Sequence, residues 1–209
     1  ESFTSRSGVS IIDGQMTRRG VLIGEEVTVQ IDYFTIQNCL SADFEGGGMY
    51  VGNRSRVTLS HMLVQNNRAG KVDTFTTTEW SGGGIAMGSY SLLRIRDSRI
   101  EYNTATSDAG GIKVGYSTLV MTSSVVAHNS ADRAGGIGVG AVIDLTNCVV
   151  AYNRSGFDYG GGIYSSDGVL TLKDSLVIGN EAAIGGGGIY GHDMNIENST
   201  IAYNTAQEG

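Results

Sequence analysis

One short sequence unit recurs seven times along the chain, and this repeat limits the possible folds more than any other feature. In every copy, the residues ten, eight and three positions before the end of the unit are apolar, as in Val57, Leu59 and Val64. The successive ends are 28, 36, 26, 24, 27 and 24 residues apart. The residues at the ends of the seven copies are Cys39, Asn67, Asn103, Asn129, Asn153, Asn180 and Asn204.

The apolar positions ten and eight before each end are two residues apart, which is the alternation of a β-strand and not the period of a helix. Each unit also contains a glycine run followed by an apolar residue, as in Gly82-Gly83-Gly84-Ile85. We therefore expect a three-faced coil with one strand on each face: one strand after the glycines, one around positions ten to eight, and one around position three. A chain of such units predicts an all-β fold, a right-handed parallel β-helix of about seven coils of 24–28 residues.

Composition agrees with this architecture. The chain has 32 glycines and no proline, whereas a disordered linker is normally rich in both. The glycines recur in clusters and not at every third residue, which excludes a collagen-like chain. We expect the glycines where the backbone bends or approaches its neighbour closely. We expect the asparagines to form a stacked ladder that caps backbone groups at another bend.

The repeat divides the chain into two parts. Residues 27–209 are predicted to form the β-helix, with a longer connection at 68–81, and residues 1–26 a degenerate first coil or cap. The sequence stops where the next glycine strand would begin, and an open coil exposes unpaired strand edges. We therefore expect either a segment of a longer solenoid or a unit that stacks end to end on other copies.

The two repeated motifs resemble a known family. The Gly-Gly-Gly-Ile and Ile/Val-x-x-Asn forms found here are similar to the repeats in the passenger regions of chlamydial polymorphic outer-membrane proteins, although Phe is replaced throughout. The resemblance covers residues 27–209 and implies a bacterial surface or extracellular protein. Pectate-lyase-like enzymes share this architecture, and a fold does not determine a function.

Charge and hydropathy exclude several classes of partner. The net charge of −7 and the lack of basic clusters make nucleic acid a poor partner. No run of 18 apolar residues exists to span a membrane. We expect an extracellular or cell-surface structural or adhesive scaffold. A carbohydrate-active β-helix and a subunit of an end-stacked filament remain as alternatives. Other copies, carbohydrate or a host or cell-surface protein are the partners that these hypotheses imply.

Aromatic residues are the first candidates for ligand or partner contact. The longest connection contains Phe75 and Trp80, which either contact a ligand or pack back on the rod. Tyr50, Tyr164 and Tyr190 follow the glycine run on what should be the outer face. No acid lies in that column, and no catalytic residue can be assigned.

Acidic residues recur in the connections that follow the asparagines. Stacking should bring Asp108, Asp132 and Asp158 to one edge, where Ca²⁺ is a possible ligand, although no calcium-loop motif is present. A solvated acidic edge is the simpler interpretation, so no cofactor is predicted. The histidines fall at different repeat positions, and His128 should join a stacked column of rings. Asn53 and Asn198 begin Asn-x-Ser/Thr sequons and are possible glycosylation sites.

Overall fold

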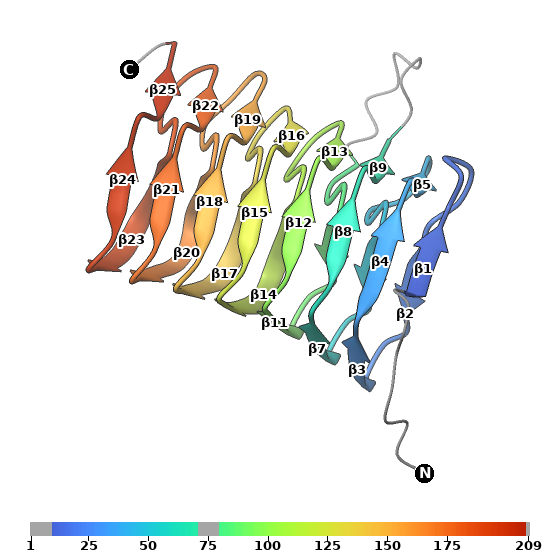
Figure 1. The fold of residues 1–209 in the computed structure, drawn as a ribbon. Coiled ribbons are helices and arrows are strands. Elements are labelled where there is room, and N and C mark those ends of the chain that lie inside the picture. The colour runs from blue at the N-terminus through green and yellow to red at the C-terminus, as the bar shows by residue number, and fades with distance from the viewer. Residues whose placement is uncertain (1–9, 71–79, 208–209) are drawn as a thin grey trace.

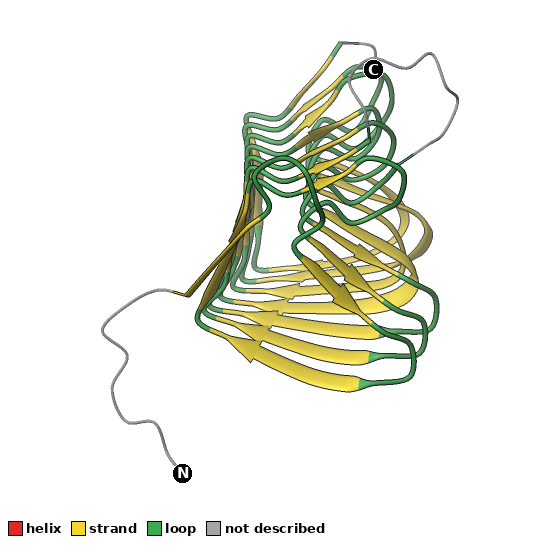
Figure 2. Cartoon of the chain, turned by 90° about the vertical axis from the view of Figure 1, so that its right-hand side faces the viewer, coloured by secondary structure: helices red, strands yellow, loops and turns green. Residues whose placement is uncertain are grey.

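The computed structural model describes residues 10–70 and 80–207. These residues form a rod of stacked coils built entirely from β-strands, with every strand pairing parallel to the equivalent strand of the next coil (Figure 1). Seen along its axis, the rod has three faces that enclose one interior (Figure 2). The described part of the chain contains no helix with the length and apolar character needed to cross a bilayer.

Each face is one parallel sheet. Sheet A contains the strands around position three before each ladder residue: β1 (Ser10–Asp13), β4 (Phe34–Gln37), β8 (Leu63–Gln65), β12 (Arg99–Glu101), β15 (Val125–Ala127), β18 (Val149–Ala151), β21 (Leu176–Ile178) and β24 (Thr200–Ala202). Sheet C contains seven strands of two residues: β5 (Leu40–Ser41), β9 (Arg68–Ala69), β13 (Thr104–Ala105), β16 (Ser130–Ala131), β19 (Arg154–Ser155), β22 (Glu181–Ala182) and β25 (Thr205–Ala206).

Sheet B combines the two strands that the sequence analysis placed on separate faces. In the early coils the strand after the glycines and the strand at positions ten to eight are separate: β2 (Val21–Ile23), β3 (Thr28–Asp32), β6 (Met49–Val51), β7 (Arg56–Ser60), β10 (Ile85–Met87) and β11 (Leu92–Arg96). In the later coils they merge into one long strand: β14 (Ile112–Thr122), β17 (Ile137–Thr146), β20 (Ile163–Lys173) and β23 (Ile189–Glu197). The expected number of faces is therefore confirmed, but the expected assignment of strands to faces was wrong.

The apolar columns form the interior. Val57, Leu59 and Val64 are almost completely buried, and the equivalent residues of the next four coils are equally inaccessible. Burying one such side chain contributes roughly 1.5–3 kcal/mol, and each is covered only by the coils on either side. The dependence on neighbours is visible in the last coil, where Met194 and Ile196 remain 45% and 41% exposed.

The asparagines form a buried ladder along the rod. The side-chain oxygen of Asn129 accepts hydrogen bonds from the backbone N–H of Asn103 (2.9 Å) and from its side-chain Nδ2 (3.0 Å). Its own Nδ2 donates to the carbonyl of Ile100 and to Oδ1 of Asn153, each at 3.0 Å. The same pattern runs from Asn67 to Asn204. Buried amides are stabilising only when satisfied in this way.

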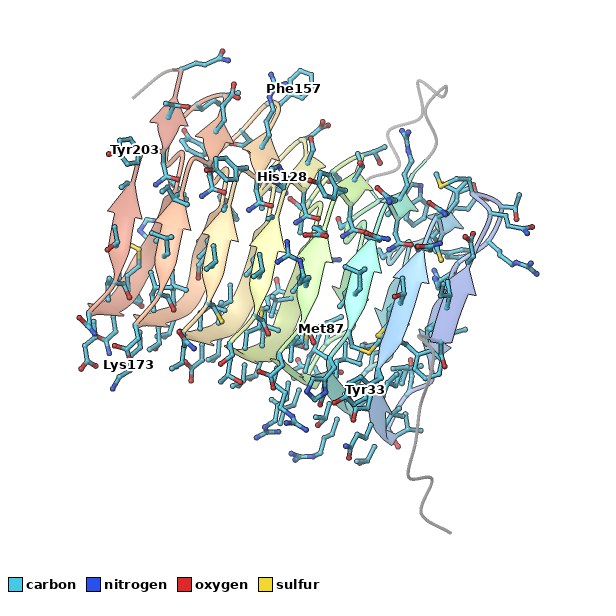
Figure 3. The ribbon with its side chains drawn as sticks, viewed as in Figure 1. Tyr33, Met87, His128, Phe157, Lys173 and Tyr203 are labelled. Carbon is cyan, nitrogen blue, oxygen red and sulfur yellow. The ribbon has the colours of Figure 1, made fainter. Side chains whose placement is uncertain are left out.

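Close packing explains the glycine runs. A Cβ on Gly48 would lie 2.6 Å from the carbonyl oxygen of Gly84 and 2.9 Å from Nδ2 of Asn67, so this position excludes any side chain. Most left-handed bends, however, do not use glycine. The position just before the ladder residue has positive φ in Tyr102 (56°), His128 (55°) and Tyr152 (55°). Their rings stack at 4.8 and 5.2 Å, which confirms the column expected around His128 (Figure 3).

Residues before the first full coil also join the sheets. β1 pairs with β4 in sheet A, and β2 pairs with β6 in sheet B. Residues 10–23 thus supply two strands of an incomplete coil. The connection at 68–81 begins with β9, but residues 71–79, including Phe75, lie outside the described residues.

Candidate functional site

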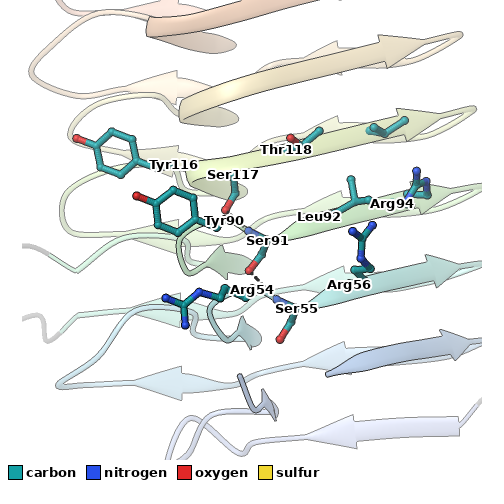
Figure 4. Close-up of a pocket in the computed structure, with 11 residues that line it drawn as sticks. Arg54, Ser55, Arg56, Tyr90, Ser91, Leu92, Arg94, Tyr116, Ser117 and Thr118 are labelled. Carbon is teal, nitrogen blue, oxygen red and sulfur yellow. Dashed lines mark hydrogen bonds between the residues drawn. The ribbon is translucent and has the colours of Figure 1, made fainter. Parts of the chain in front are cut away.

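A groove lies on the outer side of sheet B where three coils meet, and we call it the sheet B groove (Figure 4). Its volume of about 700 Å³ is within the range of small-molecule sites. Its eleven lining residues come from successive coils: Arg54, Ser55, Arg56, Tyr90, Ser91, Leu92, Arg94, Tyr116, Ser117, Thr118 and Val120.

The rim of the groove is set by the bend inside sheet B. Arg54 and Tyr90 have positive φ (55° and 59°) in the turns that precede β7 and β11. In the next coil the bend falls within β14, where Gly115 has positive φ and the pairing with β17 shifts between Gly115 and Thr118. These bends leave the rings of Tyr90 and Tyr116 standing outward, 77% and 73% exposed.

Three buried serines fix this bend. The backbone N–H of Ser55 donates to Oγ of Ser91 (3.2 Å), and the backbone N–H of Ser91 donates to Oγ of Ser117 (2.9 Å). Each hydroxyl in turn donates to a carbonyl of the preceding coil, as from Ser91 to Gly52 at 2.8 Å. Such satisfied buried networks make a rigid support. The tyrosines above the serines are therefore held on a fixed base.

The groove is positively charged. Arg54 forms an exposed ion pair with Glu26 at 2.9 Å. Arg56 and Arg94 are exposed and have no ion pair within the described residues. None of the lining residues carries a carboxylate. The groove thus offers aromatic faces and free guanidinium donors, which suit binding; it offers no acid pair for glycoside hydrolysis.

The tyrosines proposed from the sequence point outward from sheet B, but other side chains cover them. The ring of Tyr164 stacks on that of Tyr190 at 5.4 Å, and the guanidinium of Arg133 lies 5.4 Å from the Tyr164 ring. Arg19 lies over Tyr50 at 5.6 Å. Burial is the main cause that raises the pKa of Tyr50. These rings form packed clusters and are half-buried, unlike Tyr90 and Tyr116.

Trp80 packs back on the rod. Its half-buried side chain contacts a cluster of Ala69, Ala105 and Ala131, and its ring lies 6.0 Å from Phe44. This is the packing interpretation that the sequence left open beside ligand contact. Phe75, the other aromatic residue of that connection, lies outside the described residues.

The acids proposed as a cation edge surround an arginine. Arg133 pairs with Asp108 and lies 3.9 Å from Asp158. Burial, and then the charge of Asp108, raise the pKa of Asp132. Within the described residues no three His, Cys, Asp or Glu side chains are arranged to hold a metal ion. The edge is therefore organised around an ion pair.

The sequon asparagines take part in local hydrogen bonds. Asn53 donates to Glu25 (2.8 Å) and accepts from the backbone N–H of Ser89 (2.8 Å). Asn198 is exposed and donates to Asp174. Glycosylation at Asn53 would break contacts that join neighbouring coils, whereas Asn198 is the more accessible of the two.

Sequence reasoning missed the sheet B groove and one histidine pair. The groove could have been found by aligning the outward positions thirteen, eleven and nine before each asparagine, because Tyr90 and Tyr116 coincide at position thirteen. No partner was predicted for His61, but its Nδ1 lies 2.8 Å from Oδ1 of Asp32 and its ring stacks on Tyr33 at 4.2 Å. Asp32 and Tyr33 belong to the preceding coil, so aligning the two coils residue by residue would have placed them next to His61.

Comparison with known proteins places the chain in a family. The family model for the right-handed β-helix region matches residues 19–201. Searches of the curated proteins and of the solved structures find no match. The matched segment includes every residue of the sheet B groove and nearly the whole solenoid. The chain therefore belongs to the right-handed β-helix family.

Proposed function

We propose that this chain is an adhesive scaffold of the extracellular or cell-surface type, and that it binds carbohydrate in the sheet B groove. The observation that carries the proposal is the pair of tyrosines, Tyr90 and Tyr116, which stand one coil apart and are largely exposed. A tyrosine ring has an apolar face and a polar tip, so it can pack on a sugar ring and also hydrogen-bond to a hydroxyl.

The framework around the groove supports binding over catalysis. The three buried, hydrogen-bonded serines hold the groove side chains in place before a ligand arrives. This reduces the conformational entropy that is lost on binding. The groove lining lacks the paired carboxylates that a hydrolase uses. A carbohydrate-active enzyme, the alternative from the sequence, would need its acid and base from elsewhere.

A glycan array with matched variants tests this proposal. The wild-type chain is expected to bind a subset of the glycans. The affinity of Tyr90→Ala/Tyr116→Ala for these glycans is expected to be at least tenfold lower. Tyr203→Ala is the control, because Tyr203 is even more exposed (85%) but lies in the last coil, outside the groove. Equal thermal midpoints for the three proteins would exclude unfolding. The proposal fails if the wild type binds no glycan, or if the two tyrosine variants behave alike.

The surface location is part of the same proposal. The likeness of the Gly-Gly-Gly-Ile and asparagine repeats to chlamydial outer-membrane passengers supports it. Immunodetection on intact cells of the source organism tests it, because a surface protein is labelled without permeabilisation. Labelling that requires lysis would contradict a surface location.

End-to-end stacking is a second candidate function. Met194, Ile196 and Ile201 occupy the interior columns but are 41–46% exposed in the last coil. A following coil or a second copy would bury them, as neighbouring coils bury their equivalents. Sedimentation of the chain beside Ile196→Lys/Ile201→Lys tests this: assembly lost in the variant supports stacking, and a monomeric wild type at high concentration contradicts it.

A further inference from the structure

Two arginines of the sheet B groove have no carboxylate partner among the described residues, although the chain is acidic. Among the described residues, seven Lys and Arg side chains have a carboxylate within 4.0 Å; these are Arg54, Arg96, Arg99, Lys113, Arg133, Arg154 and Lys173. Arg56 and Arg94 have none within the described residues, and neither do Arg18, Arg19 and Arg68, although the net charge of the chain is −7. Both are exposed, and both line the same groove.

The strand register fixes the spacing of these two arginines. Arg56 of β7 pairs with Leu92 of β11, and Thr58 pairs with Arg94. The two Cα atoms are thus one strand and two residues apart, or about 8 Å from the strand spacing and rise. Residues two apart share a face, so both side chains leave the outer surface of sheet B. Tyr90 lies in the turn two residues before Leu92.

We propose that the sheet B groove binds an anionic saccharide, whose carboxylate or sulfate groups pair with Arg56 and Arg94 while its rings pack on Tyr90 and Tyr116. This inference rests on the proposed carbohydrate-binding function and adds the chemical class of the ligand. A guanidinium presents planar paired donors that match a carboxylate or a sulfate oxygen pair. Two unpaired guanidinium groups at a fixed spacing favour a ligand with repeated negative charges.

The surroundings favour a short anionic saccharide segment over nucleic acid. The positive region is narrow: in the row of outward residues that contains Arg94, Val120 follows in the next coil and Asp144 in the one after. Only a short segment of an anionic chain can therefore pair with the two arginines at one time. Nucleic-acid binding relies on many phosphate contacts, and two arginines provide few.

The test compares three polysaccharides of different charge by isothermal titration calorimetry: polygalacturonate for carboxylate, dextran sulfate for sulfate, and neutral dextran. Wild-type protein is expected to bind at least one acidic polymer and to bind dextran at least tenfold more weakly. Arg56→Gln/Arg94→Gln is expected to reduce affinity for the acidic polymer by at least tenfold per arginine, which corresponds to about 1.4 kcal/mol for each lost guanidinium contact. The acidic polymer that binds identifies the anion.

Arg154→Gln is the matched control, because Arg154 is exposed, lies on β19 of sheet C and pairs with Glu181. It should bind like the wild type. Circular dichroism melts of all variants check the fold, which the exposed substitutions should leave unchanged. Single-stranded DNA is tested beside the glycans, and tighter binding of DNA would overturn the inference.

The remaining outcomes separate the two proposals. If dextran binds as tightly as the acidic polymers, and only Tyr90→Ala/Tyr116→Ala lowers affinity, the anionic inference is wrong and carbohydrate binding stands. If Arg154→Gln weakens binding as much as Arg56→Gln/Arg94→Gln, the loss reflects the net charge of the protein and not the groove. The inference is then wrong. If no glycan of either kind binds, both proposals fail.

Discussion

The asparagine ladder gives a sharp test of what holds the coils together. Replacing Asn129 by alanine removes four side-chain hydrogen bonds from the middle of the rod. Two buried donors then lose their acceptor: the backbone N–H of Asn103 and one N–H of its side-chain amide. No water has access to replace them, because Asn103 and Asn129 are at most 1% exposed.

The expected cost follows from these two donors. Each buried and unsatisfied group costs about 1–3 kcal/mol, so Asn129→Ala should lower the free energy of unfolding by roughly 2–6 kcal/mol. This is a large part of the roughly 5–15 kcal/mol that stabilises a typical domain. Asn129→Asp should be at least as harmful, because its carboxylate cannot donate to Ile100 and faces Oδ1 of Asn153.

Urea denaturation followed by circular dichroism measures these changes, with Asn204→Ala as the control. Asn204 makes the same contacts to Asn180 at 2.9 Å, but it is half-buried in the last coil, where water can replace it. We expect the control to lose less than about 1 kcal/mol, the net value of a typical hydrogen bond. Equal losses for Asn129→Ala and Asn204→Ala, or a stable Asn129→Asp, would refute the reasoning.

Three further outcomes follow from packing and burial. Gly83→Ala should destabilise strongly, because its Cβ would clash with the carbonyl oxygens of Thr104 and Gly110, whereas Gly24→Ala, with open space around it, should be neutral or slightly stabilising in thermal melts. Leu172→Lys should unfold the chain, because Leu172 is fully buried, while lysine at Thr171 on the outer face should be tolerated. Burial raises the pKa of both cysteine thiols, which are free. The stability that the protonated thiols contribute is therefore fully present below the ordinary thiol pKa of about 8.5. It is lost as the pH rises through the higher pKa values of the thiols in the folded state. Alkaline urea titrations of wild type and a double cysteine-to-alanine variant should differ above that pH, and identical curves would contradict this linkage.

The interior of the rod was predictable from the sequence because burial repeats with the coil. Val57, Leu59 and Val64 recur at fixed distances before the asparagine, and only a stacked solenoid places every copy in one column. The family match and the parallel pairing confirm this part. The ladder asparagine was identified by the same count, since a polar residue at an invariant place in an apolar repeat needs partners within the repeat.

The division of the coil into faces was harder to predict. The strands of sheet C are only two residues long, as in Thr104–Ala105, and two residues cannot show alternation. The merged strand β14 contains a bend at Gly115, whose positive φ no apolar pattern records. Left-handed bends at tyrosine and histidine also lack a glycine signal.

The candidate site was missed for a related reason. Tyr90 and Tyr116 are 26 residues apart, and the repeat before them is lengthened by the connection at 68–81. Their proximity appears only after the coils are aligned on the asparagines, and the concave shape depends on the bend below them. The tyrosines that were proposed shared a visible column, but Arg19 and Arg133 cover two of them.

The ladder has a direction, and this affects how the chain can be assembled. Oδ1 of each asparagine accepts from the coil before it, and its Nδ2 donates to a carbonyl of that same earlier coil, as from Asn153 to Val126. A coil is therefore completed by side chains that are synthesised after it. A chain emerging with its N-terminus first would always carry one unfinished coil at its growing end. Folding in step with synthesis or export would then advance one coil behind the emerging chain. A pause would each time leave the backbone N–H and the side-chain amide of the last ladder asparagine without their acceptor.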